Sequence, residues 1–169
     1  MKEYAFDNGN VNWAELEAGF ISQEDFVKAH QNTVICCHDV LINYQGGILL
    51  IKRDNVPAKD LLWPIGGRVL RGVPTEESLR RKVKAECNLE LDNIKYLGTS
   101  RAIFSTDPFQ HGQGTDCFAL MYSADGSGEL KLDNLHKDPL IVTKEKYIEI
   151  RDSLYPYVQD FMDKLFKNS

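Results

Sequence analysis

The sequence predicts an α+β fold in which helices cover a mixed sheet. Three observations predict it: β-branched apolar runs come first, a segment with helical spacing of apolar residues follows, and further apolar runs lead to a last amphipathic segment. A chain of 169 residues can bury a sizeable core, so we expect one domain over residues 1–169. Residues 1–20 mix polar and aromatic residues without a clear period, as an N-terminal arm would.

The first half of the predicted fold is a short helix followed by a hairpin. Ser22 begins the helix as its N-cap, and Asp25 stands at the reciprocal position of a capping box. Residues 33–43 are apolar and β-branched, which predicts a buried strand. Residues 44–47 have the composition of a turn, and residues 48–52 return as a second strand.

A central helix and two further strands come next. Pro74 is favoured in the first turn of a helix and Thr75 as its cap, while Asn88 can end the helix in the left-handed conformation. Residues 94–104 and 116–123 then have the composition of strands. We therefore expect this helix to connect the hairpin to a second pair of strands.

The last part of the chain contains a turn and an interrupted helix. Residues 125–128 are rich in turn-forming residues. Thr143 begins a helical region that Pro156 interrupts. For two of the histidines the sequence predicts a location: we expect His30 on a helix surface and His111 in a flexible glycine-rich loop.

Composition and charge argue against several classes of function. The 25 acidic residues outnumber the 20 basic ones, and the formal net charge of −5 argues against nucleic-acid binding. No stretch is apolar enough to span a membrane, and the first residues lack the apolar core of a signal peptide. The four cysteines have no C-x-x-C spacing, so we expect reduced thiols in a cytoplasmic protein.

The most informative segment runs from Gly66 to Leu91 and reads GGRVLRGVPTEESLRRKVKAECNLEL. It resembles the Nudix box, G-x5-E-x7-R-E-U-x-E-E-x-G-U, in which U is aliphatic. With Gly67 as the first glycine, the box residues that are kept are Arg81, Val83, Glu86 and Leu89. The box residues that are lost are replaced by Val73, Lys82, Ala85 and Asn88. The frame is that of a diphosphate-cleaving fold, with one carboxylate left of its metal-binding set.

The helix of the box predicts one metal ion. Positions 82, 85 and 86 share one helix face, and in the full box this face carries three glutamates that bind hard divalent cations. Here the carboxylate of Glu86 and the carbonyl of Gly66 can hold a single Mg²⁺ or Mn²⁺ ion. They can hardly hold the several ions that generate a metal-bound nucleophile aimed at phosphorus.

The pattern R-x-x-x-A-E over residues 81–86 resembles the GDP-mannose mannosyl hydrolase branch of the Nudix superfamily. Features outside the box resemble the same branch and extend over residues 20 to about 150. They are the segment FISQEDF at 20–26, Asp39, Lys52-Arg53, Pro57-Ala58, Gly66-Gly67-Arg68, Gly114-Thr115-Asp116 and His136. The resemblance implies a Nudix-type α/β/α sandwich with a mixed sheet.

The resemblance also implies a reaction and a set of roles. That branch cleaves the C–O bond at the anomeric carbon with inversion and releases the sugar and GDP. Carried over to this sequence, His136 would be the general base, and Arg53 and Arg68 would hold the leaving diphosphate. Asp39 and Phe26 would contact the substrate, with Phe26 near the nucleobase and across the interface of a homodimer. A neutral imidazole, with a pKa near ~6.5, can accept a proton at cellular pH.

Two other functions stay open. The chain could be a nucleotide or nucleotide-sugar binding module without catalysis, which the losses in the box favour, together with Leu135 in place of a polar metal ligand. It could also be a conventional pyrophosphohydrolase with ligands such as Asp107 or Asp116. We rank the nucleotide-sugar hydrolase first because of four residues, which are Glu86, His136, Arg53 and Arg68.

Overall fold

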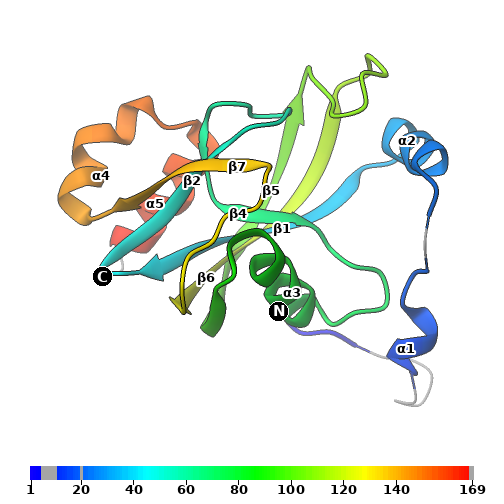
Figure 1. Ribbon diagram of the computed structural model, residues 1–169, viewed down its shortest axis with the longest axis horizontal. Helices are drawn as coiled ribbons and strands as arrows, with labels where there is room; N and C mark the ends of the chain where they lie inside the picture. Colours follow the sequence, from blue (N-terminus) through cyan, green and yellow to red (C-terminus); the bar gives the residue numbers. More distant parts are fainter. Residues whose placement is uncertain (5–10, 20, 168–169) are drawn as a thin grey trace.

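The computed structural model describes residues 1–4, 11–19 and 21–167, so Phe20 of the predicted opening segment lies outside the described residues. A sheet runs through the middle of the molecule, and helices pack on both of its faces (Figure 1). This arrangement confirms the predicted α+β fold with α/β/α layers. None of the helices in the described part of the chain is long and apolar enough to cross a membrane.

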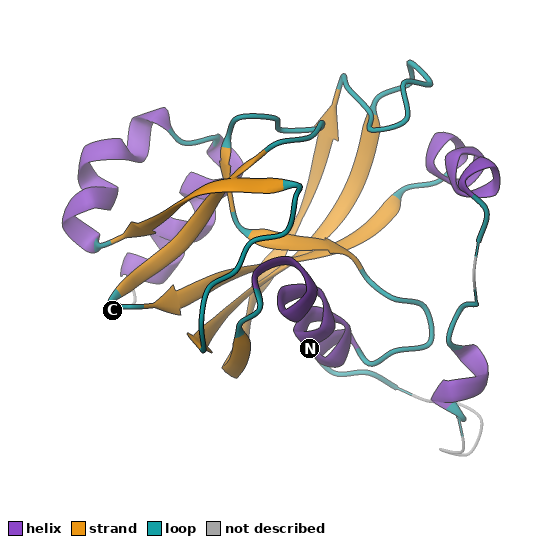
Figure 2. Cartoon of the chain, viewed as in Figure 1, coloured by secondary structure: helices purple, strands orange, loops and turns teal. Residues whose placement is uncertain are grey.

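Five α-helices, seven strands and one 3-10 helix make up the described fold (Figure 2). In chain order they are α1 (Trp13–Leu16), α2 (Gln23–Asn32), β1 (Ile35–Tyr44), β2 (Gly47–Arg53), β3 (Leu62–Trp63), β4 (Ile65–Arg68), α3 (Thr75–Cys87), β5 (Glu90–Phe104), β6 (Thr115–Ser127), β7 (His136–Val142), α4 (Lys144–Ile150), the 3-10 helix η1 (Arg151–Ser153) and α5 (Pro156–Lys167). The strand order is β3-β2-β1-β6-β5, with β4 paired to β1 and β7 paired to β2. Strands β1 and β6 are parallel and the other pairs are antiparallel, so the sheet is mixed.

Two apolar clusters, one on each face of the sheet, hold the layers together. On one face Leu79 and Val83 of α3 pack against the sheet, and on the other face Val158 and Phe161 of α5 do so. Successive residues of β1 point alternately into the two clusters, which is why the middle of this strand is buried from both sides. Burying one large apolar side chain in this way stabilises the fold by about 1.5–3 kcal/mol.

Helix α3 has the expected limits but not the expected cap. Asn88 follows its last residue with φ of 60°, which is the left-handed termination that the sequence predicted. At the other end Pro74 occupies the N-cap position, and Thr75 is already the first helical residue. The hydroxyl and backbone N–H of Thr75 instead donate to the carboxylate of Glu3. The N-terminal segment therefore supplies the cap that the local sequence lacks.

The predicted turn at residues 125–128 is wrong, because β6 continues through it to Ser127. Strand β5 begins at Glu90, earlier than expected, and pairs with this extension of β6. Asp125 in the extension accepts hydrogen bonds from the side-chain amides of Asn43 and Asn93 on the two flanking strands. These cross-strand bonds favour the ladder over a local turn, and they involve residues far apart in the sequence.

Strand β7 was not predicted, and it carries His136 as its first residue rather than leaving it in a loop. It pairs with β2 in a register that changes once along its length: Leu50 lies opposite Leu140, but Lys52 lies opposite Lys137. Three steps along β7 therefore match two along β2, which is a β-bulge. Asp138 lies inside this bulge with φ of 45°. The bulge brings His136 opposite Arg53 at the end of the ladder.

The N-terminal segment lies against helix α3 and the loop before it. Arg71 donates to the backbone carbonyl of Leu16 at 2.6 Å, and Glu17 pairs with Arg81 at 2.9 Å. Gly72, with φ of 72°, lies so close to residues 16 and 17 that a side chain there would overlap their backbone. Arg81 thus has an acidic partner from the arm, in addition to Glu77 on its own helix.

Candidate functional site

A cavity of about 390 Å³ collects nearly all of the predicted site residues. Strands β1, β2, β4, β6 and β7 and helix α3 form part of its wall, and α2 with the loop between β5 and β6 forms the rest. The predicted residues that line it are Phe26, Arg53, Gly66, Arg68, Glu86 and His136. They come from five different elements, so the fold assembles this group from distant parts of the sequence.

The charge of this cavity is opposite to that of the chain. Its lining includes the cationic side chains of Arg53, Arg68 and Lys82, and among the described residues the only carboxylate in that lining is Glu86. The whole chain carries a formal net charge of −5. A concentration of positive charge in a concave site of an acidic protein favours an anionic ligand.

Glu86, His136 and Asp133 lie close together at one side of the cavity, and His136 and Asp133 are hydrogen-bonded. The Nδ1 atom of His136 lies 2.7 Å from Oδ1 of Asp133, and its Nε2 atom lies 3.9 Å from Oε2 of Glu86. Since an ionised carboxylate can only accept, Nδ1 must be the donor to Asp133. In the neutral imidazole Nε2 then carries the lone pair, on the side that faces the cavity. This geometry suits a general base.

Asp133 is a residue of the candidate site that reasoning from the sequence did not single out. It precedes His136 by three residues, and its Oδ1 atom also accepts the backbone N–H of Leu135 at 2.9 Å. This turn fixes the imidazole from behind. The spacing of Asp133 and His136 was visible in the sequence and could have indicated a carboxylate–imidazole pair.

The residues present fit one divalent metal ion. Ligand atoms of Glu86, Asp133 and His136 lie within 4.8 Å of one another. The Oε2 atom of Glu86 is buried and has no hydrogen-bond partner among the described residues, so an oxygen ligand is available. The other oxygen, Oε1, accepts from the ammonium of Lys82 at 2.8 Å. A metal ion and Lys82 would therefore share the carboxylate of Glu86.

Arg53 of β2 and Arg68 of β4 present guanidinium groups to the cavity. The Nε atom of Arg53 is buried without a hydrogen-bond partner among the described residues, while its Nη2 donates to Asn55 at 3.2 Å. Arg68 lies over the ring of Phe26, 3.7 Å from the ring centroid, and burial lowers its pKa. Phe26 in turn meets Phe109 edge to face at 5.2 Å. An unpaired buried donor beside an aromatic wall is suited to bind a ligand with anionic and planar parts.

His30 does not lie on the helix surface as expected but is buried, with 8% of its surface exposed. Its Nδ1 atom lies 2.8 Å from Nε2 of His111, and burial, together with His111, lowers the pKa of His30. The loop that carries His111 is held by Asp107, which accepts three backbone N–H groups from residues 109, 111 and 112. Loop and helix α2 are thus joined into one wall of the cavity.

Asp39 lies beneath the cavity rather than on its lining. It contributes to a smaller adjoining cavity of about 70 Å³ that shares Arg53 and Gly67 with the main one. Gly66 passes so close to Asp39 that a Cβ at that position would overlap the carboxylate. Tyr157 donates to Asp39 at 2.6 Å, and burial raises the pKa of Asp39 to about 6. A contact between Asp39 and a substrate stays a prediction.

The sequence model of the NUDIX domain matches residues 33–165, which extend from the start of the sheet into α5. This chain belongs to the NUDIX family. The match confirms the resemblance of the box, and it agrees with an anion-binding cavity beside the box helix. NUDIX hydrolases act on nucleoside diphosphate derivatives and generally use divalent metal ions such as Mg²⁺.

Individual relatives agree with the NUDIX assignment. The chain is 24% identical over 154 residues to the low-salt glycan biosynthesis protein Agl8 of Haloferax volcanii, which covers 91% of this chain and 96% of that protein. The fold of this chain is similar to that of the MutT protein of Methanosarcina mazei, with a TM-score of 0.61 and 20% identity. The match covers 80% of this chain and 94% of that protein. A NUDIX hydrolase from Nitrosomonas europaea has a TM-score of 0.63, 14% identity and coverage of 80% and 90%. At these identities the solved structures show the fold alone.

Proposed function

We propose that the chain hydrolyses a nucleoside-diphosphate sugar resembling GDP-mannose, by attack of water at the anomeric carbon. The observation that carries the proposal is the pairing of Asp133 with His136 in a cavity whose other charged side chains are mainly cationic. An imidazole base is suited to activate water, and guanidinium groups are suited to hold a diphosphate. The name of the Haloferax relative, a glycan biosynthesis protein, supports a substrate that carries a sugar.

The proposed reaction divides the work between base and leaving group. Nε2 of His136 takes a proton from water while the water oxygen forms a bond to the anomeric carbon. The bond from that carbon to the diphosphate oxygen breaks, and its electron pair leaves with the nucleoside diphosphate. Asp133 keeps the imidazole oriented and stabilises its positive charge. Arg53 and Arg68 stabilise the charge that develops on the diphosphate.

The proposal includes one Mg²⁺ or Mn²⁺ ion, held by Glu86 and the carbonyl of Gly66. When bound, the ion would supply positive charge to the leaving diphosphate. The free Oε2 atom of Glu86 supports this assignment. Two of the candidate ligands for a conventional pyrophosphohydrolase are already engaged elsewhere: Asp107 accepts backbone N–H groups, and Asp116 pairs with both Nε and Nη2 of Arg101.

A second candidate is a nucleotide or nucleotide-sugar binding module without catalysis. The ion pair between Lys82 and Glu86 favours it, because the ammonium already neutralises the carboxylate that would hold the metal. Exposed Leu135 favours it as well, since the residue before the proposed base offers no ligand atom from its side chain. Both candidates predict that nucleotides bind; only the first predicts turnover.

One experiment separates these functions. The protein is incubated with Mg²⁺ and a panel of nucleoside-diphosphate sugars in ¹⁸O-water, and the products are separated and weighed by mass spectrometry. We expect free sugar carrying the label, with unlabelled nucleoside diphosphate. Label in a phosphate product would overturn attack at carbon, and binding without turnover of any member of the panel would favour the binding module.

We also propose a homodimer in the cytoplasm. Four side chains near one end of the sheet are exposed although apolar or weakly polar, and they are Val34, Cys36, Ile103 and Phe118. The strand register sets Cys36 beside Phe118, so a second copy could cover them together. Phe26 lines the cavity of its own chain, so this dimer does not require exchange of α2. The four free cysteines suit a reducing compartment.

The dimer can be tested by sedimentation velocity at micromolar concentration. The unsubstituted chain should sediment as a dimer and Phe118→Arg as a monomer, because a charge in an apolar interface is costly to desolvate. A monomeric unsubstituted protein would remove the dimer from the proposal.

A further inference from the structure

Lys82 is the one cation in the cavity whose position depends on the box helix and the glycine strand together. Its ammonium lies 2.8 Å from Oε1 of Glu86, one helical turn further along α3. The side chain of Glu86 is 8% exposed and that of Lys82 is 36% exposed. The pair therefore closes the inner part of the cavity, with Lys82 on the side open to a ligand.

The stem of Lys82 is held by packing as well as by charge. A Cβ atom built on Gly67 would lie 2.6 Å from Cε and 3.1 Å from Nζ of Lys82, so the stem crosses directly over this glycine. Lys84, two residues later, pairs with Glu90 on the outer surface, where the two side chains are 49% and 65% exposed. The same helix thus carries one lysine directed into the site and one outside it.

The charges of the lining match those of a diphosphate without a metal ion. Three cations, Arg53, Arg68 and Lys82, less the single carboxylate of Glu86 leave a net charge of +2 in the lining. Asp133 and Asp39 lie outside this lining, the first behind His136 and the second beneath Gly66. A nucleoside-diphosphate sugar carries two negative charges on its diphosphate. The side chains alone are therefore sufficient to neutralise the bound substrate.

We propose that Lys82 binds the diphosphate directly and competes with a divalent metal ion for Glu86. This inference rests on the proposed function only in placing a nucleoside diphosphate in this cavity. The four-carbon stem of lysine allows the ammonium to move from Glu86 to a phosphate oxygen while remaining over Gly67. Binding of the nucleotide then needs no metal, and loss of Lys82 has opposite effects on nucleotide affinity and metal affinity.

The test measures two affinities by calorimetry, that of GDP in the presence of EDTA and that of Mn²⁺ without nucleotide. The unsubstituted protein should bind GDP in EDTA. Lys82→Met should weaken GDP binding by about 10-fold to 100-fold, as expected for loss of a charge-assisted hydrogen bond. The same variant should bind Mn²⁺ more tightly, by about 10-fold, because Glu86 loses its competing cation. Lys84→Met is the matched control and should change neither affinity.

Two further arms keep the outcomes distinct. Lys82→Arg keeps the charge and should retain most of the binding of inorganic pyrophosphate in EDTA. The role of Lys82 would be overturned if the unsubstituted protein did not bind GDP in EDTA. It would also be overturned if Lys82→Met bound GDP and Mn²⁺ with the same affinities as the unsubstituted protein, even if nucleotide sugars are hydrolysed. If both affinities shift as expected but no nucleotide sugar is turned over, the role of Lys82 stands and the proposed hydrolysis fails.

Discussion

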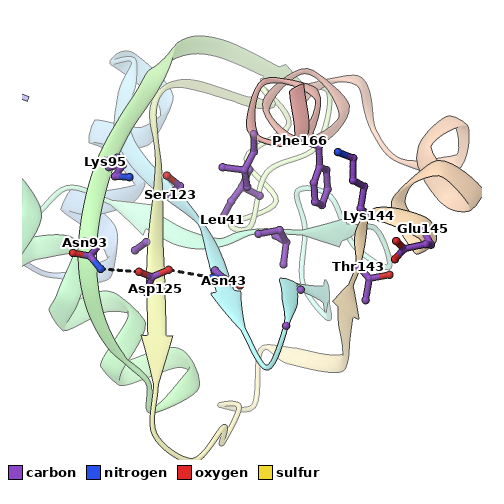
Figure 3. A pocket seen from close by; sticks show the side chains of 15 residues that line it. Leu41, Asn43, Asn93, Lys95, Ser123, Asp125, Thr143, Lys144, Glu145 and Phe166 are labelled. Atoms are coloured by element: carbon purple, nitrogen blue, oxygen red, sulfur yellow. Dashed lines mark hydrogen bonds between the residues drawn. The ribbon is translucent and has the colours of Figure 1, made fainter. Parts of the chain in front are cut away.

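The two larger cavities described on the sheet differ in charge and in hydrogen bonding. The one beside the box helix has about 390 Å³, while the one between β1, β6 and the C-terminal helices has about 550 Å³. In the larger cavity Asp125 accepts hydrogen bonds from both Asn43 and Asn93, which point toward it (Figure 3). Its two lysines, Lys95 and Lys144, are balanced by two carboxylates in the same lining.

The cavity beside the box helix lacks this internal balance. Two buried polar atoms next to it, Nε of Arg53 and Oε2 of Glu86, have no hydrogen-bond partner within the described residues. Its lining carries more cations than carboxylates. Burying unpaired polar atoms costs about 1–3 kcal/mol each, so a fold retains them where a ligand can satisfy them. Unsatisfied atoms and unbalanced charge, rather than volume, therefore mark the candidate site.

The largest expected effect is that of His136→Ala. Removing the general base should lower kcat by about 10²–10⁴ with any nucleotide sugar that the protein turns over. GDP affinity should change by less than about 3-fold, because the imidazole acts on water rather than on the nucleotide. Steady-state kinetics and calorimetry measure the two quantities. Full activity in this variant would mean that the cavity beside the box helix is not the catalytic one.

Asp39→Asn should stabilise the fold in a pH-dependent way. Burial raises the pKa of Asp39 from 3.8 to about 6, so the folded protein holds this proton more tightly than the unfolded chain. Protonation of Asp39 therefore stabilises the unsubstituted protein. This contribution is fully present below pH 3.8 and is lost as the pH rises through 6. Above that pH the ionised carboxylate costs about 3 kcal/mol, which a neutral amide avoids while still accepting from Tyr157.

Denaturant unfolding in EDTA at pH 4 and pH 8 checks this expectation. The variant should be more stable at pH 8 and nearly equal at pH 4. Asp125→Asn in the larger cavity is the control with the opposite sign, since hydrogen bonds from Asn93 and Asn43 lower the pKa of Asp125. Equal behaviour of the two variants would contradict the electrostatic difference between the cavities.

Arg53→Met should weaken GDP binding by about 10-fold to 100-fold. The substitution removes a charged donor whose Nε atom is free for a phosphate oxygen, while a methionine keeps much of the apolar stem. Lys95→Met, which removes a cation from the larger cavity, serves as the control and should leave GDP affinity within about 2-fold. If both substitutions weaken GDP binding equally, the nucleotide does not bind selectively in the cavity beside the box helix.

The smallest effect is expected for Asn43→Ala. It removes one hydrogen bond to Asp125 at 3.1 Å in an exposed setting, which should lower the free energy of unfolding by about 0.5–1 kcal/mol. Nucleotide binding and kcat should stay within about 2-fold of the unsubstituted protein. A loss of activity larger than the loss of stability can explain would give the larger cavity a functional role.

Much of the fold and of the site could be predicted because the information is local. The cap at Ser22, the limits of α3 and the register of Glu86 depend on residues within a few positions of one another. Strand β7 was missed because Pro139 lies within it, and proline normally argues against a strand. The burial of His30 was also missed, since its contact with His111 joins residues 81 positions apart.

The pairing of Lys82 with Glu86 is a different case. Its i to i+4 spacing is visible in the sequence, and the box pattern places Lys82 on the helix face that carries metal-binding glutamates in the full box. Only the path of the stem over Gly67 shows that the lysine is directed into the site. Spacing alone cannot distinguish this arrangement from a solvated lysine, because both satisfy the same helical geometry.

The bulge in β7 determines the direction of a side chain by strand pairing rather than by the chemistry of that side chain. If the same residues paired with β2 without the bulge, Lys137 would stand opposite Arg53, and His136 would point to the reverse side of the sheet. Deleting Asp138 would remove the bulge and still leave His136 opposite Arg53. For this strand, a substitution that suppresses the bulge is therefore expected to be more harmful to the site than deletion of Asp138, and a homologue should be assigned the same base by its register with β2 rather than by alignment of its histidine alone.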